Sequence, residues 1–351
     1  MADFSVNYQA GQRLRRAETL YRVEDEHYMF KYLPSSAVFY APLTYLPLQT
    51  AKAVWYALSL FCSVLLFYLA HRYFSGNAHG RLWTGIIPAL VLVRYFFREW
   101  ELGQINALVS LIVFLAVFRL ADTRPPAGIG AGILWGLSVC LKPYTVLFLL
   151  YLLVRKRWTA VVSGLSTLAL GAALPALYYG LSGNWTVHKE WFQTLTRSTP
   201  GLLSSQDNVS LFALFMKWTG DRPLALVLGG AAVFILGLVY FSMLLKASAR
   251  PQAILCEGAV LLLCIPLVSP LGWDYTLILA LPALMLLLRH YHYFSRGWQA
   301  LLAVNLLIVA LAAYDILGPV LYARFMTWSV ITLNFLVLFG FCVSLRFRRL
   351  C

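Results

Sequence analysis

Two arginines lie at one end of an apolar segment of this chain. Arg94 falls inside the segment 83–98, and Arg98 follows four residues later, so that in a helix the two side chains share one face. Two guanidinium groups on one face can bind a phosphate group through paired hydrogen bonds. The alternative is that both side chains extend to a polar interface and bind nothing. The pair is therefore a candidate phosphate site.

Lys142-Pro143 separates two short apolar runs, 128–142 and 144–154. Proline removes a backbone hydrogen bond and breaks a helix, so the first run is expected to end at this point and the second to return. Such a break holds the Lys142 ammonium at membrane depth, which makes it a third candidate phosphate ligand. The alternative is a kinked helix whose lysine reaches the interface.

A further group of candidates consists of amide and carboxylate side chains, which can form hydrogen bonds with sugar hydroxyls. They follow the ends of apolar segments, in Glu99-Trp100-Glu101-Leu102-Gly103-Gln104-Ile105-Asn106, in Ser204 to Ser210, and in Ser269-Pro270-Leu271-Gly272-Trp273-Asp274-Tyr275. The competing interpretations are helix capping and an ordinary interfacial loop rich in tryptophan. The candidates are Gln104, Asn106, Asp207, Asn208 and Asp274.

The elements that must position these residues are membrane helices. Of the 351 residues, 61% are hydrophobic and only 12% are charged, whereas soluble domains average about 25% charged residues. Apolar runs near the length of a membrane crossing recur throughout, and backbone groups in lipid must be satisfied within helices. We predict an all-α polytopic membrane protein with about eleven segments. They are 50–72, 83–98, 103–120, 128–142, 144–154, 158–182, 223–245, 252–268, 273–289, 298–316 and 323–345.

The distribution of charge orients these segments. Short loops on one side and the C-terminal tail hold 14 of the 28 lysines and arginines, so the positive-inside rule makes that side, and the C-terminus, cytoplasmic. Of the 14 acidic residues, only Asp122 and Glu257 fall near that face. Recognition or chemistry at the outer face is the natural interpretation. The net charge of +14 is explained mostly by the basic residues that set the membrane topology. It is therefore not evidence for nucleic-acid binding.

The chain is expected to form a single membrane domain over 1–351, with an outer-face loop at 1–49 and a second outer loop at 183–222. The basic N-terminal segment carries no apolar stretch of a signal peptide, although the topology places it outside. We therefore expect one more helix upstream of Met1. The six cysteines show no metal-like spacing, and no dinucleotide motif appears, so neither a metal nor a cofactor is expected.

A series of short motifs runs through nearly the whole chain. In sequence order they are Asp3, Tyr32-Leu33-Pro34, Ala41-Pro42-Leu43, Gly103-Gln104-Ile105-Asn106, Leu141-Lys142-Pro143, Asn208-Val209-Ser210 and Ser269 to Tyr275. This series resembles glycosyltransferase family 87, integral-membrane mannosyltransferases of the GT-C type that use polyprenyl-phosphate mannose. The chain departs from the family in two ways, since the family's first helix is absent and Tyr32-Leu33-Pro34 replaces a Tyr-Pro-Pro.

The resemblance implies an inverting transfer of a hexose, mannose in the family, to the hydroxyl of a glycolipid or glycan acceptor at the outer, periplasmic face of the inner membrane. Asp3 takes the place of the family's base, which removes the acceptor proton. A departing phosphate gains charge that nearby cations stabilise. Lys142, Arg94 and Arg98 are candidates for that role because they are cations at membrane depth.

Two other classes of protein remain as alternatives. A transporter or flippase of lipid-linked glycan needs broken helices through the membrane, and preferably two similar halves. The sequence shows one break, at Lys142-Pro143, without a matching second one. A polymerase or ligase of surface polysaccharides is chemically close and uses a large outer loop with a different base.

Overall fold

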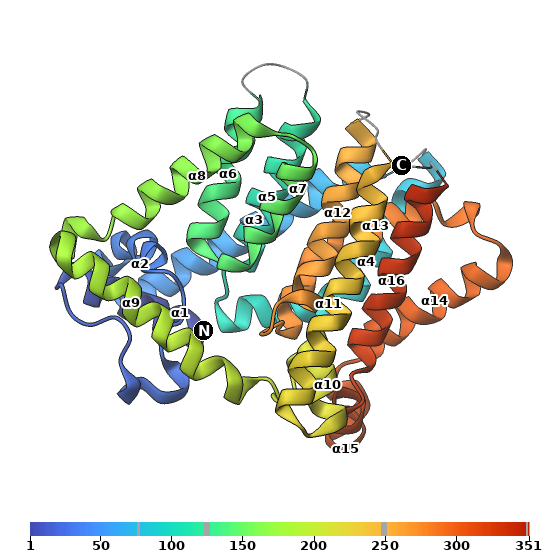
Figure 1. The fold of residues 1–351 in the computed structure, drawn as a ribbon. Coiled ribbons are helices and arrows are strands. Elements are labelled where there is room, and N and C mark those ends of the chain that lie inside the picture. Colours follow the sequence, from blue (N-terminus) through green and yellow to red (C-terminus); the bar gives the residue numbers. More distant parts are fainter. Residues whose placement is uncertain (76–77, 123–126, 247–250, 349, 351) are drawn as a thin grey trace. The chain divides into compact units, whose positions relative to one another are not determined.

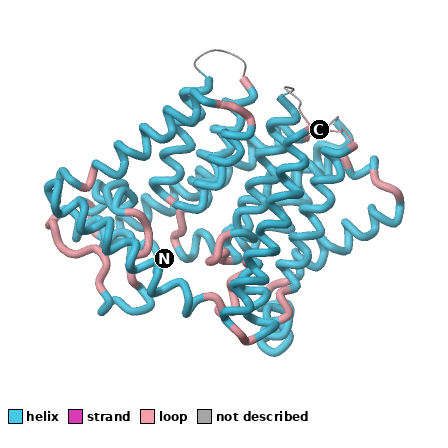
Figure 2. The backbone as a smooth tube through the Cα atoms, viewed as in Figure 1, coloured by secondary structure: helices cyan, strands magenta, loops and turns pink. Residues whose placement is uncertain are grey.

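The computed structural model describes residues 1–75, 78–122, 127–246, 251–348 and 350. These residues form helices joined by short connections, and no strand occurs among them (Figures 1 and 2). An isolated bridge pairs Asn208 with Trp273. The prediction of an all-α fold is confirmed.

Among the described residues, four helices are long and apolar enough to cross a membrane: α3 (Leu48–Phe74), α11 (Arg222–Leu245), α12 (Pro251–Val268) and α16 (Val330–Phe347). Three sharply bent helix pairs pass the same test, which gives up to seven spans in the described part of the chain. This number of spans is lower than the eleven predicted apolar segments, because two segments can fall in one bent pair. The segments 83–98 and 103–120, for example, lie in a pair bent by 118°. The protein is a polytopic membrane protein.

The described residues form two compact units. Unit 1 comprises residues 1–64 and 99–200, and unit 2 comprises residues 65–98 and 201–351. The expectation of a single domain over 1–351 stays a prediction.

Unit 1 begins with a helix where an outer-face loop was expected. In α1 (Ala2–Arg15) the buried residues include Phe4, Tyr8, Gly11 and Leu14, a spacing that places them on one face of a helix. Burial of this face explains why the segment is helical although it is too polar to span a membrane. Three short helices follow: η1 (Val23–Tyr28), α2 (Pro34–Tyr40) and η2 (Ala41–Tyr45).

The remaining helices of unit 1 surround the proline break. The predicted break is confirmed, since α6 (Ala127–Leu141) ends before Lys142 and η3 (Pro143–Leu147) begins after it. Glycines let α6 pack closely on α8 (Trp158–Ala173), because a Cβ on Gly132 would lie 2.2 Å from the carbonyl oxygen of Ala160. The unit also contains α5 (Asn106–Ala121), α7 (Phe148–Val154), α9 (Ala176–Leu202) up to Pro200, and the last residues of α4 (Ala78–Leu102).

Most of the segment predicted as the outer loop 183–222 is also helical. Helix α9 runs to Leu202 and presents Val187 to the apolar core formed by α1, α2 and their connections. The Trp191 Nε1 of α9 donates to the carbonyl oxygen of Lys31 at 3.2 Å. Val187 and Trp191 of α9 therefore help to hold the N-terminal segment.

Unit 2 is built around α12, whose residues are almost all buried. Glu257 in α12 has no exposed surface and receives hydrogen bonds from Arg346 of α16, the nearest at 3.2 Å. This ion pair gives Glu257, one of the two acids expected near the cytoplasmic face, a structural role. The unit also contains α10 (Leu211–Thr219), η4 (Asp274–Ala280), α13 (Leu281–Arg289), η5 (Tyr291–Tyr293), α14 (Arg296–Leu311) and α15 (Tyr314–Thr327).

Candidate functional site

Asp3 is positioned by the packing of α1. The neighbouring Phe4 is fully buried, and its ring stacks on Trp55 of α3 with 5.5 Å between the centroids. Trp55 in turn donates its indole hydrogen to the carbonyl oxygen of Gly103 at 2.9 Å. Gly103 has a φ of +70°, and a Cβ there would lie 2.7 Å from the Cβ of Phe4, so glycine is required on both counts. These contacts bring the first turn of α1 to the connection between α4 and α5.

Gln104 links Asp3 to Lys142. Its Nε2 donates a hydrogen bond to Oδ2 of Asp3, and its Oε1 accepts a hydrogen bond from the Lys142 ammonium at 3.1 Å. An ammonium only donates and a carboxylate only accepts, so the two partners fix the orientation of the amide between them. The Tyr32 hydroxyl donates to the same Oε1 at 3.4 Å. The Asp3 carboxylate therefore faces an oriented donor.

Lys142 connects this amide to a buried acid. Its Nζ donates to Oδ1 of Asn106 at 2.6 Å, and Nδ2 of Asn106 donates to Oε2 of Glu99 at 2.7 Å. The other Glu99 oxygen accepts the backbone N–H of Ala107 at 2.8 Å. Lys142 is 5% exposed and Glu99 is fully buried, so each charge has the partners that burial requires. We call Asp3, Gln104, Lys142, Asn106 and Glu99 the amide–lysine cluster.

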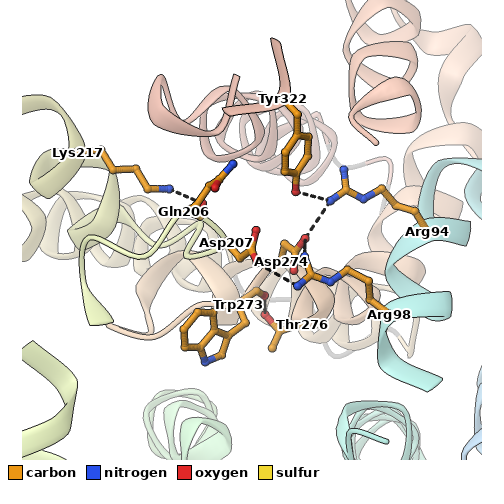
Figure 3. Close-up of polar contacts among 9 residues, drawn as sticks. All are labelled: Arg94, Arg98, Gln206, Asp207, Lys217, Trp273, Asp274, Thr276 and Tyr322. Atoms are coloured by element: carbon orange, nitrogen blue, oxygen red, sulfur yellow. Dashed lines mark hydrogen bonds and ion pairs between the residues drawn. The ribbon is translucent and has the colours of Figure 1, made fainter. Parts of the chain in front are cut away.

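Unit 2 contains a second cluster of charge. Arg94 and Arg98, one turn apart on α4, both donate to Oδ2 of Asp274, at 3.0 and 2.7 Å (Figure 3). Arg98 also donates to Asp207 at 3.0 Å, and Arg94 to the Tyr322 hydroxyl at 3.0 Å. The predicted shared face of the two arginines is confirmed by these common contacts. We call these five residues the arginine–aspartate cluster.

Backbone contacts hold the loop that carries Asp207. The carbonyl oxygen of Asp207 accepts the N–H of Asp274 at 3.0 Å, and the N–H of Val209 donates to the carbonyl oxygen of Gly272 at 2.7 Å. Asn208 is fully buried between these bonds, where its Nδ2 donates to the Pro270 carbonyl at 2.9 Å and its Oδ1 accepts from the N–H of Ser210 at 3.1 Å. The Asn208 side chain is thus committed to backbone groups in this structure.

Asn208→Ala is expected to lower the free energy of unfolding by about 2 kcal/mol, because it removes the acceptor of the buried Ser210 N–H and one donor to the Pro270 carbonyl oxygen. Unfolding in mixed detergent micelles, followed by circular dichroism, measures the effect. Asn184→Ala is the matched control, since Asn184 is more exposed and its Nδ2 donates to the carbonyl oxygen of Ala172 in the neighbouring helix α8. Equal stability of the two variants would contradict this structural role.

Lys217 ties the same loop to α15. Its ammonium donates to the carbonyl oxygens of Gln206, Asn208 and Met326, at 2.9, 2.7 and 3.2 Å. Burial lowers the pKa of Lys217 to about 8, from 10.5 in the unfolded chain. Lys217 could not be recognised from the sequence, because its partners are backbone atoms that carry no residue signature.

The pKa of Lys217 predicts how stability depends on pH. Between about pH 8 and 10.5 the unfolded chain keeps the Lys217 proton that the folded chain has lost, so this residue makes the free energy of unfolding rise with pH. Lys217→Met is expected to lack that part of the rise. Unfolding of both proteins at pH 7, 8, 9 and 10 tests this, and parallel curves for the two would contradict it.

The structure divides the predicted site residues between the two units. Unit 1 brings together Asp3, Gln104, Asn106 and Lys142, and unit 2 brings together Arg94, Arg98, Asp207 and Asp274, with Asn208 supporting the loop. Lys142 was predicted as a phosphate ligand like the two arginines. Its ammonium donates to two amides of unit 1, and its contact with a phosphate stays a prediction. Glu99 and Tyr322 complete the clusters and were not selected from the sequence. Glu99 could have been selected from the sequence by its position, because it follows Arg98 and precedes the Gly-Gln-x-Asn motif.

Each unit also has an open groove on its surface. One of about 410 Å³ follows α1 in unit 1, and one of about 500 Å³ lies beside Lys217 in unit 2. Among the described residues, no group of three or more His, Cys, Asp or Glu side chains is arranged to hold a metal ion. The first groove is lined by Ala2, Ser5, Val6, Gln9, Asp25 and Tyr28, and the second by Lys217, Trp218, Thr327, Trp328, Val330 and Leu333.

Comparison with known proteins gives consistent matches. A polyprenol-phosphate-mannose-dependent alpha-(1-2)-phosphatidylinositol mannoside mannosyltransferase of Mycobacterium tuberculosis is 23% identical over 321 residues, which cover 87% of this chain and 68% of that protein. An alpha-(1->3)-arabinofuranosyltransferase of Corynebacterium glutamicum is 25% identical over 312 residues, 86% of this chain and 70% of that protein. No solved structure shows significant similarity to the chain.

The match to the family model includes most of the candidate site residues. The model of glycosyltransferase family 87 matches residues 30–270, which include both the amide–lysine residues after Asp3 and the arginines with Asp207. The match extends over more than half of the chain, and the helices that carry it include candidate membrane spans. The protein therefore belongs to glycosyltransferase family 87 and is a membrane glycosyltransferase.

Proposed function

We propose that this protein transfers mannose from polyprenyl-phosphate mannose to a hydroxyl group of a glycolipid or glycan acceptor, with inversion at the sugar. The acceptor oxygen bonds to C1 of the sugar while the bond from C1 to the phosphate oxygen breaks. The acceptor proton goes to a protein base, and polyprenyl phosphate leaves with the bonding electrons. The lipid-linked donor carries its own leaving group, so the proposed reaction uses no cofactor.

The observation that carries this proposal is the hydrogen-bonded series from Asp3 through Gln104 to Lys142. Asp3 is the proposed base, because an oriented amide holds its carboxylate while the side chain keeps part of its surface exposed. A general base must reach the hydroxyl within hydrogen-bond distance, and a positioned carboxylate meets that condition better than a mobile one. In this proposal Lys142 orients the amide that holds the base.

Arg94 and Arg98 are the proposed ligands of the donor phosphate. They are two fixed guanidinium groups on one helix face, and preorganised cations stabilise a phosphate as it departs with additional charge. Asp274 keeps both arginines in place, since each donates to its Oδ2. Gln104 and Asn106 are proposed to contact sugar or acceptor groups.

The outer, periplasmic face is the proposed side of the reaction, and the C-terminus the proposed cytoplasmic end. The support is the excess of lysine and arginine in the loops of the opposite side, which sets the orientation of membrane helices. The proposed location is the inner membrane.

Arabinofuranose is a second candidate for the transferred sugar. The observation that favours it is the similarity to the arabinofuranosyltransferase of Corynebacterium glutamicum. The identity and the length of this match are close to those of the match to the mannosyltransferase. A choice between the two sugars requires a comparison of donors.

Purified protein in liposomes, supplied with radiolabelled polyprenyl-phosphate mannose or polyprenyl-phosphate arabinofuranose and a membrane glycolipid extract, tests the proposal. We expect covalent label in the glycolipid fraction from one of the two donors, with the anomeric configuration of the new bond opposite to that of the donor. Movement of intact donor between leaflets without covalent transfer would overturn the proposal in favour of a flippase. A retained configuration would overturn the single-step mechanism.

A further inference from the structure

We propose that Asp207 occupies the phosphate position on Arg98 in the ligand-free protein and competes with the donor phosphate for that position. This inference rests on the proposed function, in which Arg94 and Arg98 bind the phosphate of the donor. It adds a specific role for a carboxylate that otherwise neutralises the site.

The two aspartates of the cluster differ in how firmly they are held. Asp274 has no exposed surface and accepts hydrogen bonds from both Arg94 and Arg98. The Asp207 side chain is 33% exposed and pairs with Nη2 of Arg98, whose side chain is 30% exposed. A partly exposed ion pair is weaker than a buried one because water solvates both partners, whereas removal of a buried partner leaves an uncompensated charge. Asp207 is thus the partner that an incoming anion can replace.

The charges of the cluster favour the same exchange. With Asp207 in place, the two arginines and two aspartates of the cluster sum to zero, and the neighbouring Lys217 ammonium is bound to three carbonyl oxygens. A phosphodiester at the arginines would then bring a negative charge that the cluster does not balance. When Asp207 leaves Arg98, the arginines and Asp274 together carry one positive charge. This charge matches the single negative charge of a lipid phosphodiester, and partial desolvation strengthens the attraction.

The exchange requires a movement of the Asp207 side chain alone. The Asp207 carbonyl oxygen is bound by the N–H of Asp274, and the neighbouring carbonyls of Gln206 and Asn208 are bound by Lys217. Figure 3 shows the loop between Lys217 and the arginines, with the Asp207 carboxylate directed at Arg98. Rotation of a partly exposed side chain is fast compared with movement of a loop or helix. The site can therefore open and close without rearrangement of the fold.

Only molecules in which Asp207 has left Arg98 can bind a phosphate at this position. The apparent affinity for any phosphate ligand is therefore the intrinsic affinity multiplied by the fraction of such molecules. The effect applies to the lipid phosphate product as well as to the donor. Polyprenyl phosphate carries more negative charge than the donor phosphodiester and binds the cations more strongly. The return of Asp207 to Arg98 thus favours product release.

Binding of undecaprenyl phosphate to the full chain in nanodiscs tests this role. Asp207→Asn and Asp207→Ala are both expected to bind this lipid about fivefold more tightly than the wild type, the ratio that loss of one exposed ion pair can release. The gain is expected to shrink at high salt, because salt screens exposed charges. Asp315→Asn is the matched control, since Asp315 is an exposed acid of the same unit outside the cluster, and its affinity should stay within twofold of the wild type.

Arg98→Gln separates failure of this inference from failure of the phosphate assignment. If Arg98→Gln leaves the affinity for undecaprenyl phosphate unchanged, the assignment of the phosphate site is wrong and the inference with it. If Arg98→Gln weakens binding but neither Asp207 variant binds more tightly than Asp315→Asn, the site stands and the competitor role is overturned. Weaker binding by both Asp207 variants would likewise overturn it and make Asp207 a direct ligand contact.

Discussion

Asp3→Asn is expected to lower the turnover number for sugar transfer by about 10²–10⁴-fold, the range that positioned general bases contribute. An amide of the same shape accepts a hydrogen bond from Gln104 but takes no proton from the acceptor hydroxyl. The apparent affinity for the donor should change little, since the proposed phosphate ligands are Arg94 and Arg98. Initial rates with labelled donor at saturating acceptor, together with the KM of the donor, measure both effects.

Glu24→Gln is the matched control for this substitution. Glu24 is an exposed acid of η1 in the same unit, and its loss changes the net charge by the same amount as Asp3→Asn. Its turnover number should stay within twofold of the wild type. An Asp3→Asn protein that transfers sugar as fast as Glu24→Gln would remove Asp3 from the mechanism.

Asp274→Asn is expected to lower the free energy of unfolding by about 3 kcal/mol, the lower end of the range for breaking a buried ion pair. The substitution removes the negative charge between Arg94 and Arg98, and an asparagine cannot compensate two guanidinium groups. The lower end of the range applies because the side chains of Arg94 and Arg98 remain 14% and 30% exposed. Unfolding by sodium dodecyl sulfate in mixed micelles, followed by tryptophan fluorescence, measures the loss.

Two comparisons make the Asp274 result specific. Asp315→Asn removes an exposed acid of the same unit and should change stability by less than about 0.5 kcal/mol. The double variant Asp274→Asn with Arg94→Gln should recover part of the loss, because it also removes one uncompensated cation. If Asp274→Asn unfolds at the same detergent fraction as Asp315→Asn, the buried ion pair does not stabilise unit 2.

The sequence was sufficient for features that depend on neighbouring residues. Proline after Lys142 ended α6 as expected, because a proline cannot continue the hydrogen bonds of a helix. The four-residue spacing of Arg94 and Arg98 correctly placed them on one face. The spacing of Phe4, Tyr8 and Leu14 also indicates the helix α1. A search for segments long enough to span a membrane does not detect such a short amphipathic helix.

The partners of these residues were not predictable from the sequence. Arg94 pairs with Asp274, which is 180 positions away, and Lys142 with Gln104 and Asn106, 38 and 36 positions away. Spacing along the chain shows which side chains share a helix face, whereas the face that a helix turns toward its neighbours is set by tertiary packing. Lys142 illustrates the limit, since burial of an ammonium was foreseen but the choice of amides as its partners was not.

Asp3 is proposed to perform a chemical step in transfer from a lipid-linked sugar. A single-turnover experiment tests it most directly, with protein in liposomes in excess over radiolabelled polyprenyl-phosphate mannose and with glycolipid acceptor present. We expect the wild type to convert the bound donor into labelled glycolipid, and Asp3→Asn to bind the same fraction of donor while forming product at least a hundredfold more slowly. Product formation at the wild-type rate by Asp3→Asn, from an equal amount of bound donor, would contradict this account.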